Sequence, residues 1–179
     1  TYKARIESGT AVSFAGWSKP VVEPEVAVHI GRDVAAGASR DGAAAAIAGI
    51  SPAIEIVDLH EPPEDPERIL GHNIYQRHVV LAGSGPARVG NASTGLTCRI
   101  IRRGAEQART TDPQANTGQW GDIVRHVADL LAAFGERLRA GEIIITGSVV
   151  PPLVIAPDED DFTFALEPAG TVSACFRSP

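Results

Sequence analysis

Hydrophobic and polar residues alternate most regularly between positions 21 and 31. Glu23, Glu25 and His29 alternate there with aliphatic side chains. A two-residue period is typical of a β-strand whose two faces meet different surroundings. The pattern therefore predicts a strand that carries both glutamates on one face.

Longer spacings indicate a helix between residues 112 and 141. Its apolar positions are Trp120, Ile123, Val124, Val127, Leu130, Leu131 and Phe134. They recur every three or four residues beside a polar face, which predicts an amphipathic helix that ends at Gly135 or Gly141.

An alanine-rich segment predicts a second, short helix over 43–48. We expect Asp41 to be its N-cap, and Gly49 and Pro52 to end it, because glycine and proline do not continue a helix. Residues 61–67 contain three prolines among acidic side chains, which is typical of a surface loop.

Short apolar segments bounded by Gly, Pro or Asp predict the remaining strands. They span 53–58, 78–82, 96–102, 142–146, 153–156, 162–166 and 171–176. Residues 1–20 show no sustained period and predict an irregular N-terminal segment with one short strand at most. Many short strands beside one long helix predict an α+β fold with mixed or antiparallel sheets, in a single domain over 1–179.

Composition narrows the class of protein. The 179 residues are 44% hydrophobic and 21% charged, and no apolar run is long enough to span a bilayer. The net charge of −6, without a cluster of Lys or Arg, argues against nucleic acid as a partner. Cys98 and Cys175 have no metal-ligand spacing and are expected to be buried, reduced thiols. With no export signal, these features favour a soluble cytoplasmic protein without a membrane partner.

The Glu23-Pro24-Glu25 segment is the first candidate for chemistry. Two carboxylates at i and i+2 of a strand project from one face and can converge on one cation. Mg²⁺ and Mn²⁺ prefer such oxygen ligands, and Mg²⁺ commonly keeps positions for water and substrate. Taken alone, the pair is more typical of a solvated strand face than of a metal site.

Glu55 strengthens the metal hypothesis because it interrupts an otherwise apolar strand. Burial of an uncompensated carboxylate is costly, and pairing or metal coordination is the usual remedy. Glu55 is therefore a candidate third ligand. His29 shares the face of the first two glutamates, but a hydrogen-bonded structural histidine is the commoner explanation for such a residue.

Three ordered segments closely resemble those of the fumarylacetoacetate hydrolase superfamily. They read VEPEVA at 22–27, PAIEIVD at 52–58 and LRAGEIIITGS at 138–148. A fourth segment, GTVSACF at 170–176, resembles the closing strand of the 2-keto-4-pentenoate hydratase and 4-oxalocrotonate decarboxylase branch. The resemblance implies mixed β-sheets rolled around the active site, with flanking helices.

The resemblance also implies a Mg²⁺ or Mn²⁺ ion held by Glu23, Glu25 and a third acid. By position that acid is Glu55, with Asp58 as the alternative because other branches use an aspartate in the corresponding strand. The 2-oxo group and carboxylate of a substrate would bind the metal, which stabilises an enolate as it forms. Hydration, decarboxylation and C–C hydrolysis can all pass through such an intermediate.

Further residues are implied by the same resemblance. Residues 2–5, Tyr-Lys-Ala-Arg, resemble a Tyr/Trp-Lys-x-Gly stretch whose lysine is the general acid/base, although the glycine is missing here. Lys3 is thus a candidate catalytic residue. Asn73 matches part of an Asp-Asn-Ala stretch, and Thr146 lies next to Gly147 at a strand end, so both are candidate substrate-binding residues.

We therefore expect a metal-dependent lyase, either a hydratase or a decarboxylase, that acts on a small unsaturated 2-oxo acid from aromatic-compound breakdown. The resemblance also suggests a homodimer or larger homo-oligomer. An acylpyruvate-type C–C hydrolase and a non-catalytic binding protein that retains the fold are the alternatives.

Two departures from the family bear on this choice. Segments that mark the C–C hydrolase branch are missing, which disfavours hydrolysis. The N-terminal domain usual in such hydratases is also not among these residues. Because the sequence begins with Thr1 and contains no methionine, we expect either that its N-terminus has been removed or that further residues precede it.

Overall fold

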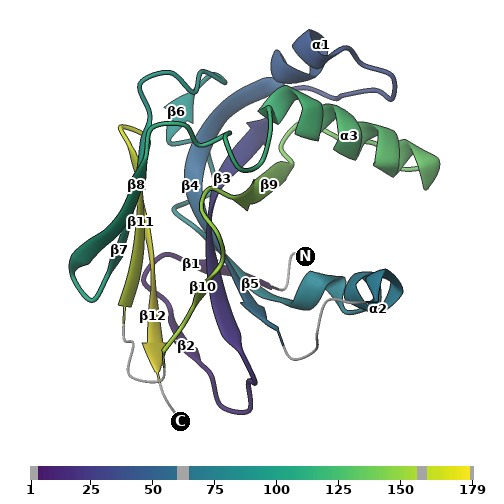
Figure 1. Cartoon of the computed structure of the whole chain (residues 1–179). Helices are drawn as coiled ribbons and strands as arrows, with labels where there is room; N and C mark the ends of the chain where they lie inside the picture. Colours follow the sequence, from purple (N-terminus) through teal and green to yellow (C-terminus); the bar gives the residue numbers. More distant parts are fainter. Residues whose placement is uncertain (1–3, 60–64, 157–160, 178–179) are drawn as a thin grey trace.

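Two β-sheets pack face to face, and the helices lie at one end and along the outer side of the larger sheet (Figure 1). The structure is a computed structural model that describes residues 4–59, 65–156 and 161–177. The larger, seven-stranded sheet contains β1 (Arg5–Glu7), β3 (Pro20–Ile30), β4 (Ile47–Asp58), β5 (Gln76–Leu81), β6 (Arg88–Val89), β9 (Ile143–Ser148) and β10 (Leu153–Val154). The smaller, five-stranded sheet contains β2 (Ala11–Ser13), β7 (Thr97–Arg102), β8 (Ala105–Thr110), β11 (Asp161–Glu167) and β12 (Gly170–Arg177).

Strand order shows that both sheets are mixed. The larger sheet has the order β1-β5-β4-β3-β10, with β6 paired to β4 and β9 paired to β3, and the smaller has the order β2-β12-β11-β7-β8. Each contains one parallel pair, β1 with β5 and β2 with β12, among antiparallel neighbours. The helices are α1 (Arg40–Ala44), α2 (Pro66–Gly71) and α3 (Trp120–Ala133), and a 3₁₀ turn spans Asn73–Tyr75. The predicted α+β class with mixed sheets is confirmed.

The main hydrophobic core fills the space between the sheets. Val26 and Ile54 of the larger sheet and Phe162 and Phe164 of the smaller one are fully buried there. Side chains of a strand alternate between its two faces, so the same pairing that places these residues inside turns their neighbours to the outer face. The outer face of the larger sheet therefore carries Glu23 and Glu25 of β3 and Glu55 of β4.

The long amphipathic helix forms as predicted. α3 is followed by Gly135 with a positive φ of 76°, which is the backbone conformation that glycine adopts most easily at a helix end. Trp120 and Val124 are buried, whereas Phe134 at the end of the apolar stripe is 78% exposed. No helix among the described residues is long and apolar enough to cross a membrane.

The helix predicted over 43–48 is wrong in its bounds and its cap. α1 ends before this range does, and Ser39 rather than Asp41 accepts the backbone N–H of the first turn. Gly49 and Pro52 lie inside β4, which pairs with β3 along its length. A few alanines favour helix only weakly, so burial in a continuous sheet outweighs their preference.

The N-terminal segment is more regular than predicted. Among the described residues of 1–20, β1 joins the larger sheet and β2 joins the smaller one, so this segment connects both. Each strand has only three residues, which is too short for a recognisable period. The loop expected at 61–67 lies partly outside the described residues, and α2 begins at its end, capped by the side chain of Asp65. The hydrophobic pattern also misses β6 and the mostly polar edge strand β8.

Neither cysteine forms a disulfide. Cys98 is buried, as predicted, and Cys175 is only half-buried. Burial raises the pKa of the Cys98 thiol to about 12, so this thiol stays protonated.

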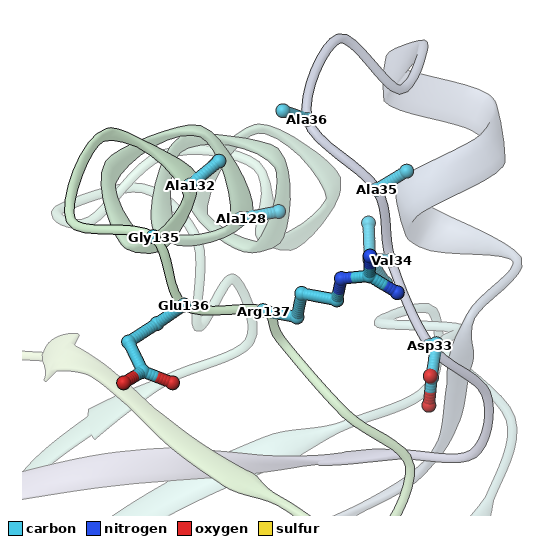
Figure 2. Close-up of a pocket in the computed structure, with 9 residues that line it drawn as sticks. All are labelled: Asp33, Val34, Ala35, Ala36, Ala128, Ala132, Gly135, Glu136 and Arg137. Atoms are coloured by element: carbon cyan, nitrogen blue, oxygen red, sulfur yellow. The ribbon is translucent and has the colours of Figure 1, made fainter.

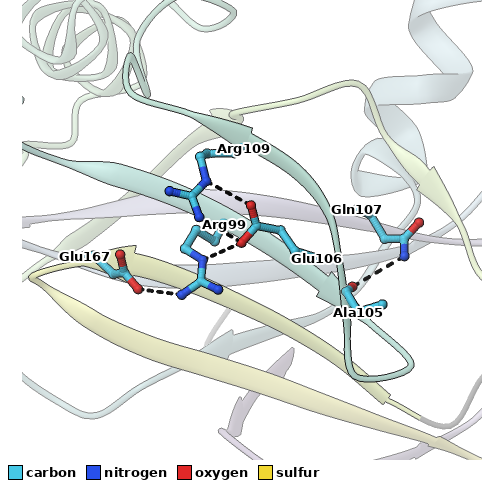
Figure 3. A network of polar contacts seen from close by, with 6 residues as sticks. All are labelled: Arg99, Ala105, Glu106, Gln107, Arg109 and Glu167. Atoms are coloured by element: carbon cyan, nitrogen blue, oxygen red, sulfur yellow. Dashed lines mark hydrogen bonds and ion pairs between the residues drawn. The ribbon is translucent and has the colours of Figure 1, made fainter.

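The outward side of the smaller sheet carries a charged network (Figure 3). Arg99 lies 2.6 Å from Glu106 and 2.8 Å from Glu167, and Arg109 lies 2.8 Å from Glu106. The guanidinium groups of Arg109 and Arg99 lower the pKa of Glu106 to about 2. Because exposed ion pairs stabilise folds little, the network chiefly orients side chains across β7, β8 and β11.

Gly49 provides a test of the packing between β4 and the β6 segment. A Cβ at this position would collide with the Arg88 carbonyl oxygen and lie 2.6 Å from the Cβ of Pro86. We expect Gly49→Ala to lower the free energy of unfolding by about 1–3 kcal/mol, as overpacked sites do. Chemical denaturation measures the change. Gly85→Ala is the control, since a Cβ there meets nothing within 4 Å, and equal stability of the two variants would contradict this packing.

Candidate metal centre

Three glutamates lie together on the outer face of the larger sheet. Glu23 of β3 and Glu55 of β4 are direct cross-strand partners, and Glu25 lies two residues further along β3. One carboxylate oxygen from each residue lies within 4.8 Å of the other two. The structure thus brings together the three acids that the sequence predicts as metal ligands.

The surroundings of this cluster disfavour three negative charges. Glu25 is 2% exposed, and Glu23 and Glu55 are half-buried. Burial raises the pKa of all three carboxyl groups, and the charge of Glu55 adds to the increase at Glu23 and Glu25. The pKa of Glu25 rises to about 8. None of the ion pairs among the described residues involves the cluster.

A divalent cation suits this donor set. Three converging carboxylates offer the oxygen ligands that Mg²⁺ and Mn²⁺ prefer, and a positive ion would offset their repulsion and favour their charged forms. The residues therefore fit the expected metal.

Two hydrogen bonds from other strands orient the acids. The Gly147 N–H of β9 donates to Oε2 of Glu25 at 2.7 Å, and Nε2 of Gln76 in β5 donates to Oε1 of Glu55 at 2.6 Å. Such partners fix the rotamers of metal-binding side chains. Gly147 has a φ of 94°, and a Cβ there would lie 3.3 Å from Cγ2 of Thr117, so a larger residue would disturb this donor.

Pro24 interrupts the backbone hydrogen bonding of β3 next to these contacts. Proline lacks an N–H and is therefore unusual inside a central strand. The Pro24 carbonyl accepts from Val149 N–H, so the side of β3 that lacks a donor faces β9 and β10. β3 changes partner there, from β10 at Val22 to β9 at Glu25, and the β9 register shifts just beyond Glu25. The proline lies where the ladder is interrupted.

Asp58, the alternative third ligand, is occupied elsewhere. Its Oδ1 accepts the backbone N–H groups of Ser18 and Lys19 at 3.0 and 2.9 Å, and its Oδ2 lies 3.3 Å from the Arg77 guanidinium. These contacts hold the segment that leads into β3. In this structure Glu55, and not Asp58, faces the other two acids.

The Thr-Gly-Ser segment forms the last three residues of β9, and its two hydroxyl groups make different contacts. Thr146 is buried and donates to the Val26 carbonyl at 3.0 Å, so its hydroxyl proton is engaged. Ser148 is the cross-strand partner of Glu25, and its buried Oγ has no hydrogen-bond partner among the described residues. Sequence reasoning selects Thr146 and misses Ser148, because the irregular β9 register hides which hydroxyl faces the acids.

The other predicted residues lie at different distances from the cluster. Asn73 is exposed and donates to Gln76 at 3.4 Å, so it reaches Glu55 only through that glutamine. His29 bonds to Ser51 at 2.7 Å, which supports its structural role. Lys3 lies outside the described residues.

A groove of about 570 Å³ adjoins the cluster, between β5, β9 and α3. It is lined by Gln76, which donates to Glu55, and by Val79, the cross-strand partner of Glu55. Val127 and Leu131 of α3 also line it. A ligand held at the acids can therefore extend along aliphatic side chains.

A second hollow, of about 620 Å³, lies between α3 and residues 33–36 (Figure 2). Four of its nine lining residues are alanines, and Arg137 runs toward the 33–36 segment while Glu136 points away. It contains none of the predicted site residues, so we do not assign the chemistry to it.

The fold and the acid cluster together define a mixed-sheet α+β domain with a carboxylate site suited to a divalent cation. The chain belongs to the fumarylacetoacetate (FAA) hydrolase C-terminal family, which it matches over residues 2–177. The family resemblance expected from the sequence is confirmed.

Similar proteins include two named hydratases. The chain is 31% identical over 182 residues to a 2-hydroxyhexa-2,4-dienoate hydratase from Comamonas testosteroni, covering 95% of this chain and 66% of the relative. It is 28% identical over 183 residues to 2-keto-4-pentenoate hydratase 1 from Dechloromonas aromatica (strain RCB), covering 96% and 65%. The chain thus spans just under two thirds of the length of these relatives.

Solved structures share the fold. One is 4-oxalocrotonate decarboxylase from Pseudomonas putida G7 complexed with magnesium and adipate, with a TM-score of 0.82, 22% identity, and coverage of 98% of this chain and 67% of that one. Another is fumarylpyruvate hydrolase from Pseudomonas aeruginosa in complex with Mn²⁺ and pyruvate, with a TM-score of 0.71, 13% identity, and coverage of 98% and 74%. At these identities the likeness concerns the fold alone.

Glu25→Gln tests the charge balance of the metal-free cluster. Since the folded-state pKa of Glu25 is raised, its protonated form favours folding, and that stability is lost as pH rises from 4.5 to about 8. We expect the metal-free wild type to lose stability relative to Glu25→Gln across this interval. Denaturation in the presence of a chelator measures the difference. A difference that does not change with pH would show that Glu25 is not strained.

Added Mg²⁺ or Mn²⁺ should reverse this order, because an ion that binds only the folded state stabilises it. We expect the melting temperature of the wild type to rise and that of Glu25→Gln to rise much less. Glu136→Gln, which removes an exposed glutamate outside the cluster, should respond like the wild type. Equal responses of wild type and Glu25→Gln would argue against a metal at these acids.

Proposed function

We propose that this domain is a divalent-metal-dependent lyase, a hydratase or decarboxylase, that acts on a small unsaturated 2-oxo acid. The main support is the cluster of Glu23, Glu25 and Glu55 beside an aliphatic groove. The names of the similar hydratases support this reaction class, and those proteins are longer than this chain.

The three glutamates would hold Mg²⁺ or Mn²⁺. When bound, the ion supplies Lewis-acid chemistry, which polarises a 2-oxo group and favours proton loss from the adjacent carbon. Fold neighbours whose names include calcium, magnesium or Mn²⁺ support a divalent ion as the cofactor.

The residues around the ligands would position the site and the substrate. Gln76 and Gly147 hold Glu55 and Glu25 in fixed orientations, which lowers the cost of organising the site. Val79 and its aliphatic neighbours in the groove would contact the hydrocarbon part of the substrate and exclude water. Ser148, with its unpartnered hydroxyl opposite Glu25, is a further candidate substrate contact.

The residues predicted to contact substrate would have different roles. Asn73 would act at the rim, because its exposed amide reaches the site through Gln76. Thr146 would act mainly by fixing β9 against β3, since its hydroxyl bonds to the Val26 carbonyl. Lys3 is proposed as the general acid/base that moves a proton at a substrate carbon, on the strength of the family resemblance. A homodimer or larger homo-oligomer in the cytoplasm also remains a prediction.

Turnover assays test the reaction class. With Mg²⁺ or Mn²⁺, we expect the ultraviolet absorbance of 2-hydroxypenta-2,4-dienoate to fall if the domain is a hydratase, and carbon dioxide to be released from 4-oxalocrotonate if it is a decarboxylase. Mutation of a residue that hydrogen-bonds to a metal ligand typically lowers metal affinity or activity by about 10–100-fold. Loss of a ligand itself, in Glu23→Gln or Glu55→Gln, should therefore lower kcat/KM by about 100-fold or more.

Glu136→Gln again serves as the control, with unchanged kcat/KM expected. Cleavage of an acylpyruvate in place of these reactions would favour the hydrolase. Inertness toward every 2-oxo acid, with metal bound, would favour a binding protein that retains the fold.

Lys3→Met tests the proton-transfer role separately. General acid–base groups contribute about 10²–10⁴-fold, so we expect kcat to fall by at least about 100-fold while KM changes little. Metal-induced stabilisation should be retained, because lysine is not a ligand. Wild-type kcat in this variant would exclude Lys3 from the reaction.

A further inference from the structure

A row of side chains crosses the outer face of the larger sheet and joins the acids to a positive charge. Glu23, Glu55, Val79 and Arg5 are successive cross-strand partners on β3, β4, β5 and β1. Neighbouring strands are about 4.8 Å apart, so the backbone of Arg5 lies roughly 10 Å from that of Glu55. The row therefore has carboxylates at one end, an aliphatic side chain between, and a guanidinium group at the other end.

Arg5 borders the same groove as the residues next to the acids. It lines that groove together with Gln76, Val79 and Leu81. Val79 and Leu81 also belong to the small apolar cluster on this face, with Ala27 and Ala53. A chain-like ligand that starts at the acids and follows these apolar side chains would meet the arginine.

The contacts of Arg5 leave capacity for an anion. Its guanidinium donates to the Gly83 carbonyl at 3.1 Å and lies 3.5 Å from Glu7, whose side chain is 71% exposed. Guanidinium has five N–H donors, and an exposed ion pair neutralises little of its charge. Glu142, the acidic residue that lines the groove, accepts the Arg139 N–H at 2.7 Å and is thereby held by its own turn.

We propose that Arg5 binds a second carboxylate at the distal end of the substrate, so that the domain prefers 2-oxo dicarboxylates over 2-oxo monocarboxylates. The inference rests on the proposed function, because the 2-oxo end must lie at the acid cluster. Arginine suits this task, since its planar donor pair matches the two oxygens of a carboxylate. The aliphatic stretch between the two ends sets the distance that a substrate chain must span.

Binding of two matched acids tests the proposal without turnover. 2-Oxoadipate and 2-oxohexanoate have the same number of carbons and differ in the terminal group, which is a carboxylate in one and a methyl in the other. With Mn²⁺ bound, we expect calorimetry to show that the wild type binds 2-oxoadipate at least about 10-fold more tightly, as charged hydrogen bonds predict. Arg5→Gln should abolish this preference and leave the affinities for 2-oxohexanoate and Mn²⁺ unchanged.

Two controls separate recognition from structure. Arg5→Gln loses the hydrogen bond to the Gly83 carbonyl, which contributes about 1 kcal/mol, so the melting temperature of this variant should stay within about 4 °C of the wild type. Arg125→Gln removes another arginine with one weak ion pair, 3.4 Å from Asp122, and should keep the preference for 2-oxoadipate.

The outcomes distinguish this proposal from the reaction class. Equal wild-type affinity for the two acids, or a preference that survives in Arg5→Gln, would overturn the role of Arg5 and leave the proposed function standing. Failure of Mn²⁺-loaded protein to bind either acid would overturn both. A preference for 2-oxoadipate that is lost in Arg5→Gln supports the inference even if neither hydration nor decarboxylation is detected.

Discussion

Repulsion between three carboxylates on one face of a sheet is the constraint on which the site depends. Glu23 and Glu55 face each other across two strands, and Glu25 is almost fully buried beside them, so the β3–β4 ladder holds the three side chains close together and leaves only side-chain rotation to separate the carboxylates. The opposite face of the same strands is packed into the main core, which prevents rotation of the sheet. Core packing thus keeps acidic groups together that would otherwise move apart, and a divalent cation would relieve the resulting repulsion.

The site is also coupled to an irregularity in the sheet. Pro24 removes a donor between the two acids of β3, where that strand changes partner from β10 to β9. The interruption leaves the Gly147 N–H free to bind the Glu25 carboxylate and places Ser148 opposite it. A regular ladder would have used such groups for pairing, so the local loss of sheet hydrogen bonds supplies polar groups to the site.

Across the outer face of the larger sheet, the side chains change from acidic to aliphatic to basic. Carboxylates lie on β3 and β4, aliphatic side chains on β5 and α3, and Arg5 on β1. This order separates a place for a cation from a place for an anion by an apolar stretch. The short strand β1 therefore extends the site beyond the residues that the family resemblance identifies, because its parallel pairing with β5 brings residues near the N-terminus beside it.

Local sequence determined the face on which Glu23 and Glu25 lie and the amphipathic helix α3, because a two-residue or 3.6-residue period is a property of neighbouring residues. It also identified Glu55 as a candidate ligand, because a charged residue in an apolar strand can be recognised from its neighbours alone. It did not determine the bounds of α1, where sheet pairing outweighed alanine preference. Only tertiary structure decided that Glu55 rather than Asp58 faces the other acids, that Gln76 and Ser148 join them, and that Arg5 lies in the same row. These outcomes depend on strand register, which is set by contacts between residues far apart in the chain and leaves no local period to read.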